Sequence, residues 1–178
     1  MRARLAAALS VAACFAFASC GGDEGPGTVK LYDRAPVPGV PDRTTAVDPS
    51  ALNPDGAYWG ELLFPGDSSR QSLTFRITQA FFADACVEEL GADECPNDFG
   101  TLSDPSLDVD AALADLLSIT VVTDDRANFA VTADELLSIA GGAKPAEEAP
   151  EGFEFAPFPF LLTVRDGKIV EARQIWLP

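Results

Sequence analysis

Histidine is absent from the 178 residues of the chain. Histidine is the usual general base near neutral pH and the commonest metal ligand. Its absence excludes serine triads, cysteine–histidine pairs and histidine-ligated zinc sites. Basic residues are scarce too, with 12 lysines and arginines against 28 aspartates and glutamates, for a net charge of −16. A chain this acidic repels polyanions, so we expect no nucleic-acid partner.

The N-terminus carries a short apolar run. Residues 5–18 are uncharged, follow Arg2 and Arg4, and precede small residues and Cys20. This order is typical of a secretory signal, and the run is shorter than the roughly 20 residues that cross a bilayer. We therefore expect residues 1–19 to be a signal peptide and the mature chain to be exported.

The end of this signal resembles the lipobox of bacterial lipoproteins. In the sequence FASC, residues 17–20, Cys20 would receive a diacylglyceryl group and become the mature N-terminus. Residues 11–14 fit the same pattern but leave a very short apolar run, and an ordinary secreted chain with a chance cysteine is the other alternative. We expect lipidation at Cys20, which anchors the chain to the extracytoplasmic face of the cell membrane.

Glycine and proline dominate the stretch after the cysteine. The sequence GGDEGPG at 21–27 and the five prolines between positions 36 and 54 favour extended backbone over helix or sheet. Isolated apolar residues at 29, 31 and 32 would be able to pack back onto the domain. We expect a tether over residues 20–55 and a single β-rich domain over 56–178.

Periodicity and turn signals give the coarse structure of that domain. Strands are expected at 57–64, 72–78, 101–111 (one strand, or two separated at Asp104-Pro105), 116–123, 158–164 and 168–177. Helices are expected at 80–90 and at 132–140, where Thr132 and Glu135 form a capping box. The fold class is mainly β, with two short helices added to a small antiparallel β-barrel, a curved sheet or a sandwich. A barrel of the oligonucleotide/oligosaccharide-binding type is one candidate.

Cys86 and Cys95 are the two cysteines expected in the mature domain. In an oxidising compartment an even pair usually forms a disulfide. The pair lacks the CxxC spacing and the basic neighbour that lower the pKa of a redox-active thiol. We therefore expect a structural disulfide.

Two groups of acidic residues are candidate sites. Asp93, Asn97 and Asp98 could offer oxygen ligands to calcium, but their spacing matches no EF-hand loop, and an Asx-type turn explains Asn97 and Asp98 as well. Asp108 and Asp110 would share one face of a strand, and glycosidases use such carboxylate pairs. Acidic residues on a solvent-exposed face are far commoner, so we expect no catalytic residue, metal or cofactor.

The run FEFAPFPF at 153–160 is unusual in composition. Its two prolines would keep it extended and partly outside a sheet. The rings either pack against the domain or remain accessible. In the second case Phe153, Phe155 and Phe158 would contact carbohydrate, peptide or a partner protein.

Two stretches carry a resemblance to a known group. They are QAFFADAC…CPNDFGTLSDP, ending at Pro105, and the C-terminal LTVRDGKIVEARQIWLP. Both are similar to segments of uncharacterised secreted or lipid-anchored proteins of actinobacteria, which share an aromatic pair, a Pro-Asn-Asp turn followed by an aromatic residue, and a final hairpin ending in Leu-Pro. The resemblance implies export and one β-rich domain, and no particular activity.

Taken together, these features predict a membrane-anchored lipoprotein whose domain is a non-enzymatic binding or structural module of the cell envelope. Its expected partners are the membrane, through the lipid, and an envelope protein or glycan. The alternative is an envelope hydrolase that acts on glycan with carboxylates alone.

Overall fold

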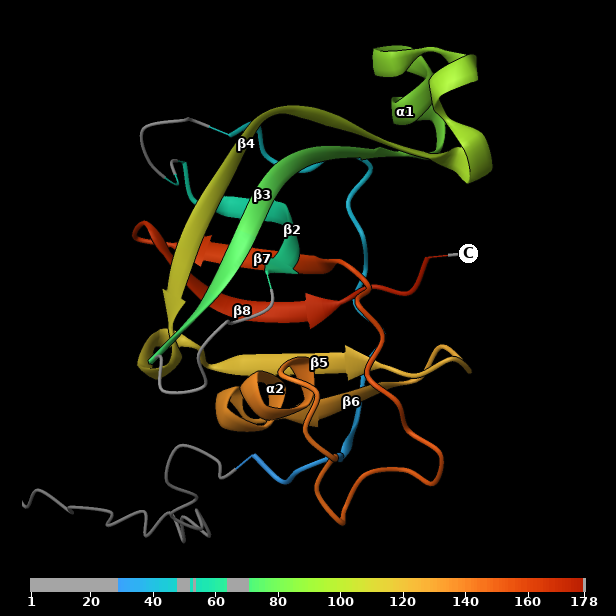
Figure 1. Ribbon diagram of the computed structural model, residues 1–178. Helices are drawn as coiled ribbons and strands as arrows, with labels where there is room; N and C mark the ends of the chain where they lie inside the picture. Colours follow the sequence, from blue (N-terminus) through green and yellow to red (C-terminus); the bar gives the residue numbers. More distant parts are fainter. Residues whose placement is uncertain (1–28, 48–51, 53, 64–70, 178) are drawn as a thin grey trace, which may run out of the picture.

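The structure is a computed structural model that describes residues 29–47, 52, 54–63 and 71–177. Over these described residues the chain forms eight strands and two α-helices (Figure 1). The strands are β1 (Arg34–Ala35), β2 (Gly56–Leu63), β3 (Ser72–Phe82), β4 (Phe99–Ala112), β5 (Ser118–Val122), β6 (Asn128–Val131), β7 (Phe160–Arg165) and β8 (Lys168–Gln174). The helices are α1 (Ala83–Leu90) and α2 (Ala133–Ala140), with short 3-10 turns at Ala92–Glu94, Pro96–Asp98 and Leu113–Asp115.

All eight strands belong to one open sheet, in the order β1-β6-β5-β8-β7-β2-β3-β4. Neighbouring strands are antiparallel except β5 and β8, which are parallel. The sheet is curved, with β3 and β4 crossing in front of β2, β7 and β8 in Figure 1. The predicted mainly β class with two short helices is confirmed. Of the three expected architectures, a barrel, a curved sheet and a sandwich, the structure is a curved sheet, and this sheet is open.

The hairpin of β7 and β8 occupies the middle of the sheet. Asp166 and Gly167 connect the two strands with φ angles of 52° and 71°. Such left-handed pairs suit a two-residue hairpin, because their twist matches that of the flanking strands. This hairpin is the one that the Asp-Gly signal predicts.

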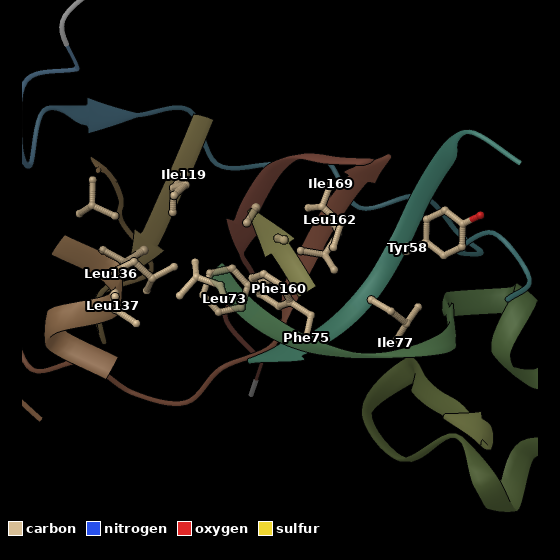
Figure 2. Packing of buried hydrophobic residues seen from close by; sticks show 14 of the residues in the cluster. Tyr58, Leu73, Phe75, Ile77, Ile119, Leu136, Leu137, Phe160, Leu162 and Ile169 are labelled. Carbon is tan, nitrogen blue, oxygen red and sulfur yellow. The ribbon is translucent and has the colours of Figure 1, made fainter. Parts of the chain in front are cut away.

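One face of the sheet forms the main core with α2. Leu136 and Leu137 of α2 lie over Leu73, Phe75 and Phe160 of the strands (Figure 2). The rings of Phe75 and Phe160 meet edge to face, with centroids 5.6 Å apart. Side chains alternate along a strand, so neighbouring residues of β2 and β7 point to the other face.

The other face is covered by residues 37–47. Trp59, Leu161 and Ile175 pack there with Val40. Thr44 is buried and is tied to Ala80 of β3, because its backbone N–H donates to the Ala80 carbonyl at 2.9 Å and its Oγ1 accepts from the Ala80 N–H at 2.7 Å.

Residues 29–47 are therefore part of the folded sheet. β1 lies in this segment and pairs with β6. Tyr32 is 6% exposed and belongs to the main core. The expectation of a tether is wrong for this segment, because a few well-placed side chains and backbone bonds hold a proline-rich stretch to the sheet. The apolar residues at 31 and 32 do pack back, as considered from the sequence.

The structure corrects one local expectation, decides between two alternatives and adds two short strands. The first helix begins at Ala83 and not at residue 80, because Ala80, Phe81 and Phe82 continue β3 opposite residues 99–101 of β4. β4 is one strand across Asp104-Pro105, with a shift of register relative to β3. β1 and β6 are not indicated by the sequence pattern, because they are only two and four residues long.

The second helix begins where expected, with half of the predicted capping box. Thr132 is the N-cap, and its Oγ1 accepts a hydrogen bond from the Glu135 backbone at 3.2 Å. The Glu135 carboxylate instead accepts bonds from Tyr32 and from the Ala146 backbone. No helix among the described residues is long and apolar enough to cross a membrane.

Candidate binding site

The aromatic run at 153–160 is divided between two places. Phe153 packs inward, with its ring 5.4 Å from that of Tyr32. Phe155 and Phe158 line a hollow beside β2. The structure therefore combines the two interpretations of the run: Phe153 and Phe155 pack against the main core, and all three rings also border hollows at the surface.

This hollow, which we call the aromatic cleft, has a volume of about 340 Å³. Its aromatic and aliphatic walls come from four parts of the chain: Trp59 of β2, Phe99 of β4, Phe155 and Phe158 before β7, and Leu177 after β8. Pro157 and Pro159 complete the wall on the side of the run. Ligand sites of small molecules are commonly concave and lined mostly by apolar side chains.

A compact group of rings supports the cleft. Trp59 and Phe82, Trp59 and Phe99, and Phe82 and Phe99 have centroids 5.4, 5.4 and 5.3 Å apart. Trp59 is only 1% exposed, so it supports the wall of the cleft but offers almost no surface to a ligand. Glu61 and Thr101 add a carboxylate and a hydroxyl to the lining, and both residues are exposed.

Gln174 holds the proline-containing wall in place. Its side chain is fully buried at the end of β8. Its Nε2 donates to the carbonyls of Ala156 and Phe158 at 2.7 and 3.1 Å, and its Oε1 accepts from the Val122 backbone at 2.9 Å. One side-chain amide thus fixes both the wall of the cleft and the end of the parallel pair β5–β8.

The predicted disulfide is present. Cys86 of α1 and Cys95 are bonded, with Cα atoms 5.9 Å apart. The bond fastens α1 to the 3-10 turn that follows it, and both cysteines pack with Phe81.

The calcium candidates lie in the two 3-10 turns on either side of Cys95. Asn97 and Asp98 both have positive φ, 60° and 59°, as turn residues do. Asp93 lies in the preceding turn. Within the described ranges, no three acidic or cysteine side chains are placed to hold one metal ion.

The carboxylates of Asp108 and Asp110 are both engaged across the β3–β4 pair. Asp108 accepts two bonds from Arg76, at 3.0 and 3.3 Å, and Asp110 accepts one from Thr74 at 2.5 Å. The guanidinium–carboxylate bonding raises the pKa of Arg76 above its usual value. Neither aspartate lines the aromatic cleft. The two residues share a face, as predicted, but this face holds cross-strand pairs on an exposed surface.

A second pocket was not indicated by the sequence. It has a volume of about 210 Å³ and lies between residues 37–40, the end of the β5–β6 hairpin and residues 174–176. We call it the terminal pocket. Trp176 lines the terminal pocket and Phe158 lines the aromatic cleft, and the centroids of the two rings are 6.4 Å apart. The sequence does not indicate the terminal pocket, because its walls come from three segments that are far apart in the chain.

The lipobox, including Cys20, lies outside the described residues. No protein family, curated protein or solved structure matches the chain. The resemblance to actinobacterial envelope proteins therefore stays a prediction.

Proposed function

We propose that the chain is a lipoprotein anchored through Cys20 at the extracytoplasmic face of the membrane, and that its domain is a non-enzymatic binding module of the cell envelope. The observation that carries the binding role is the aromatic cleft. It presents the rings of Phe155 and Phe158 on a wall that Gln174 fixes in advance. A preformed wall lowers the entropic cost of binding.

The lining favours an envelope glycan as the ligand. A sugar ring has an apolar C–H face, which packs on aromatic rings, and an edge of hydroxyl groups. Glu61 and Thr101 provide an acceptor and a hydroxyl among those rings. A protein partner is the second candidate, because an exposed proline- and phenylalanine-containing segment also suits a protein contact.

The hydrolase alternative finds less support. Hydrolysis of a glycosidic bond commonly uses two carboxylates about 5–9.5 Å apart on either side of the bond. The described lining of the aromatic cleft contains one carboxylate, that of Glu61. Asp108 and Asp110 are bonded to Arg76 and Thr74 on another surface.

The binding role is tested with the mature chain on a panel of peptidoglycan fragments and envelope glycans. Phe155→Ala and Phe158→Ala should each weaken retention at least about tenfold, since each removes an aromatic contact. Leu117→Ala is the matched control, because Leu117 is 70% exposed and lies outside the cleft. Equal loss in all three variants, or sugar turnover that Asp108→Asn abolishes, would refute the proposal.

The anchor is tested separately. Cys20→Ala should release the protein from the detergent phase to the aqueous phase on phase partitioning, because the two acyl chains are lost. A variant that still partitions with the detergent would show that Cys20 is not the anchor.

A further inference from the structure

An exposed arginine, Arg126, lines the terminal pocket. Arg126 makes no salt bridge with any acidic residue in the part of the chain that the structure describes. Its guanidinium lies over the ring of Trp176, 3.9 Å from the centroid. Stacking uses the face of a guanidinium and leaves its N–H donors at the edge, where they can bind a planar anion.

The neighbouring acidic residues do not neutralise this cation. Asp125 is hydrogen-bonded to the Thr123 hydroxyl, which lowers the pKa of the carboxyl group and keeps it turned to its own loop. Asp124 is exposed in the same turn. Arg34, Lys144 and Arg165 also form no salt bridge among the described residues, but only Arg126 of these four lines the terminal pocket.

The backbone at Arg126 is left-handed, as it is at five other non-glycine residues of the described chain. Residues 124–126 form a three-residue hairpin loop closed by bonds between Thr123 and Ala127. Arg126 has a φ of 65°. This last loop position is left-handed and favours glycine, and strained residues of this kind gather at functional sites. Arginine there disfavours the turn, while its side chain reaches the pocket.

The rest of the pocket is suited to an apolar body. Val40, Val122, Ile175 and Trp176 line it, together with Val37 and Pro38. Its volume of about 210 Å³ is below the range of roughly 300–1,000 Å³ that drug-sized ligands occupy. A small ligand is therefore implied.

We infer that the terminal pocket binds a small organic acid, with its carboxylate on the edge of the Arg126 guanidinium and a compact branched or phenyl body among the valine, isoleucine and tryptophan side chains. Carboxylate and guanidinium match in shape and charge, and a bidentate pair is stronger than neutral hydrogen bonds. This site goes beyond the proposed function and uses a different cavity, so either can fail without the other.

The two tryptophans of the chain provide a direct readout, because one supports each cavity. The mature protein is labelled with 5-fluorotryptophan, and its two fluorine resonances are assigned with Trp176→Phe. Titration with 4-methylpentanoate or 3-phenylpropanoate should shift the Trp176 signal saturably and leave the Trp59 signal in place. The matching amide, 4-methylpentanamide, should bind at least about tenfold more weakly, and acetate should produce no saturable shift.

Variants at Arg126 show whether this residue binds the organic acid or only stabilises the fold. Arg126→Gln should weaken the acid at least about tenfold. Arg126→Gly should abolish binding while the melting temperature stays equal or rises, since glycine relieves the left-handed strain. Equal affinity for acid and amide, an equal response to inorganic phosphate, or unchanged binding in both variants would overturn the inference. A lower melting temperature of Arg126→Gly with wild-type acid binding would assign the arginine to stability alone.

Discussion

The hydroxyl of Tyr32 donates a hydrogen bond to Glu135 Oε1 at 2.7 Å, across 103 positions of the sequence. The same oxygen accepts the backbone N–H of Ala146 at 2.9 Å. One carboxylate oxygen therefore joins the N-terminal segment, the first turn of α2 and the loop that follows this helix.

Tyr32→Phe should lower the free energy of unfolding by about 1.5–3 kcal/mol at neutral pH. The substitution keeps the ring against Phe153 and removes the bond to the carboxylate, and a hydrogen bond to a charged group contributes about this much. Urea denaturation measures the change. A difference below the error of the measurement would mean that water replaces the hydroxyl group with no loss of stability.

The hydrogen bond between Tyr32 and Glu135 also predicts that the stability of the fold decreases at alkaline pH. Burial, followed by the bond to Glu135, raises the pKa of Tyr32 in the folded state. The folded state therefore holds this proton more tightly than the unfolded chain does. Its contribution is fully present below the unfolded pKa of about 10 and is lost progressively as the pH rises above it. Stability should fall more steeply above that pH in the wild type than in Tyr32→Phe, and parallel curves would contradict the assignment.

Removing residues 29–47 should destabilise the domain strongly. The deletion takes away β1, the buried Tyr32 and the Thr44–Ala80 bonds. Loss of one buried aromatic side chain alone costs about 3–5 kcal/mol. A chain beginning at Asp48 should melt about 10 °C or more below one beginning at Val29. Equal melting temperatures would restore the interpretation of this segment as a tether.

Gln174→Met should cost about 2 kcal/mol or more, although it introduces an apolar side chain into a buried place. The Val122 N–H and the Phe158 carbonyl lose their side-chain partner, and each unsatisfied buried group costs about 1–3 kcal/mol. The Ala156 carbonyl keeps the hydrogen bond that it accepts from the Phe158 N–H at 2.8 Å. Chemical denaturation compares it with Gln71→Met, an exposed position where the change should stay within about 0.5 kcal/mol. Similar losses at both positions would contradict the bridging role of Gln174.

The Cys86–Cys95 bond should contribute about 2–3 kcal/mol, the loop-entropy value for a sequence separation of 9. The double variant Cys86→Ala, Cys95→Ala should lose that much in urea denaturation, and peptide mapping without reductant should recover the two cysteines joined. Two thiols that react after export would exclude the disulfide in the cell.

The sequence predicts the elements whose signals are local. The alternation of Leu73, Phe75 and Ile77 identifies β3, the Asp166-Gly167 turn identifies the last hairpin, and Thr132 identifies the start of α2. The start of α1 is misplaced because Ala80 and Phe81 suit a helix locally, while their pairing with β4 keeps them extended. Tertiary pairing overrides local preference there.

The sites are less predictable because they depend on distant pairings. Phe155 and Phe158 stand out in composition, but their neighbours Trp59 and Phe99 are brought together only by the sheet order. Arg126 has no sequence signal beyond its place in a turn, since its left-handed backbone and its contact with Trp176 appear only in three dimensions.

The central place of the β7–β8 hairpin has a kinetic consequence. In the sheet that the structure describes, this hairpin is the hydrogen-bonded link between β1-β6-β5 and β2-β3-β4, yet it follows all six of these strands in the chain. A chain that emerges from a ribosome or a channel with its N-terminus first exposes two three-stranded pieces with apolar faces before the joining strands arrive. Productive folding must then wait for β7 and β8, and such partly formed sheets are prone to aggregate. The time before this hairpin emerges is thus the period in which the protein depends most on a chaperone.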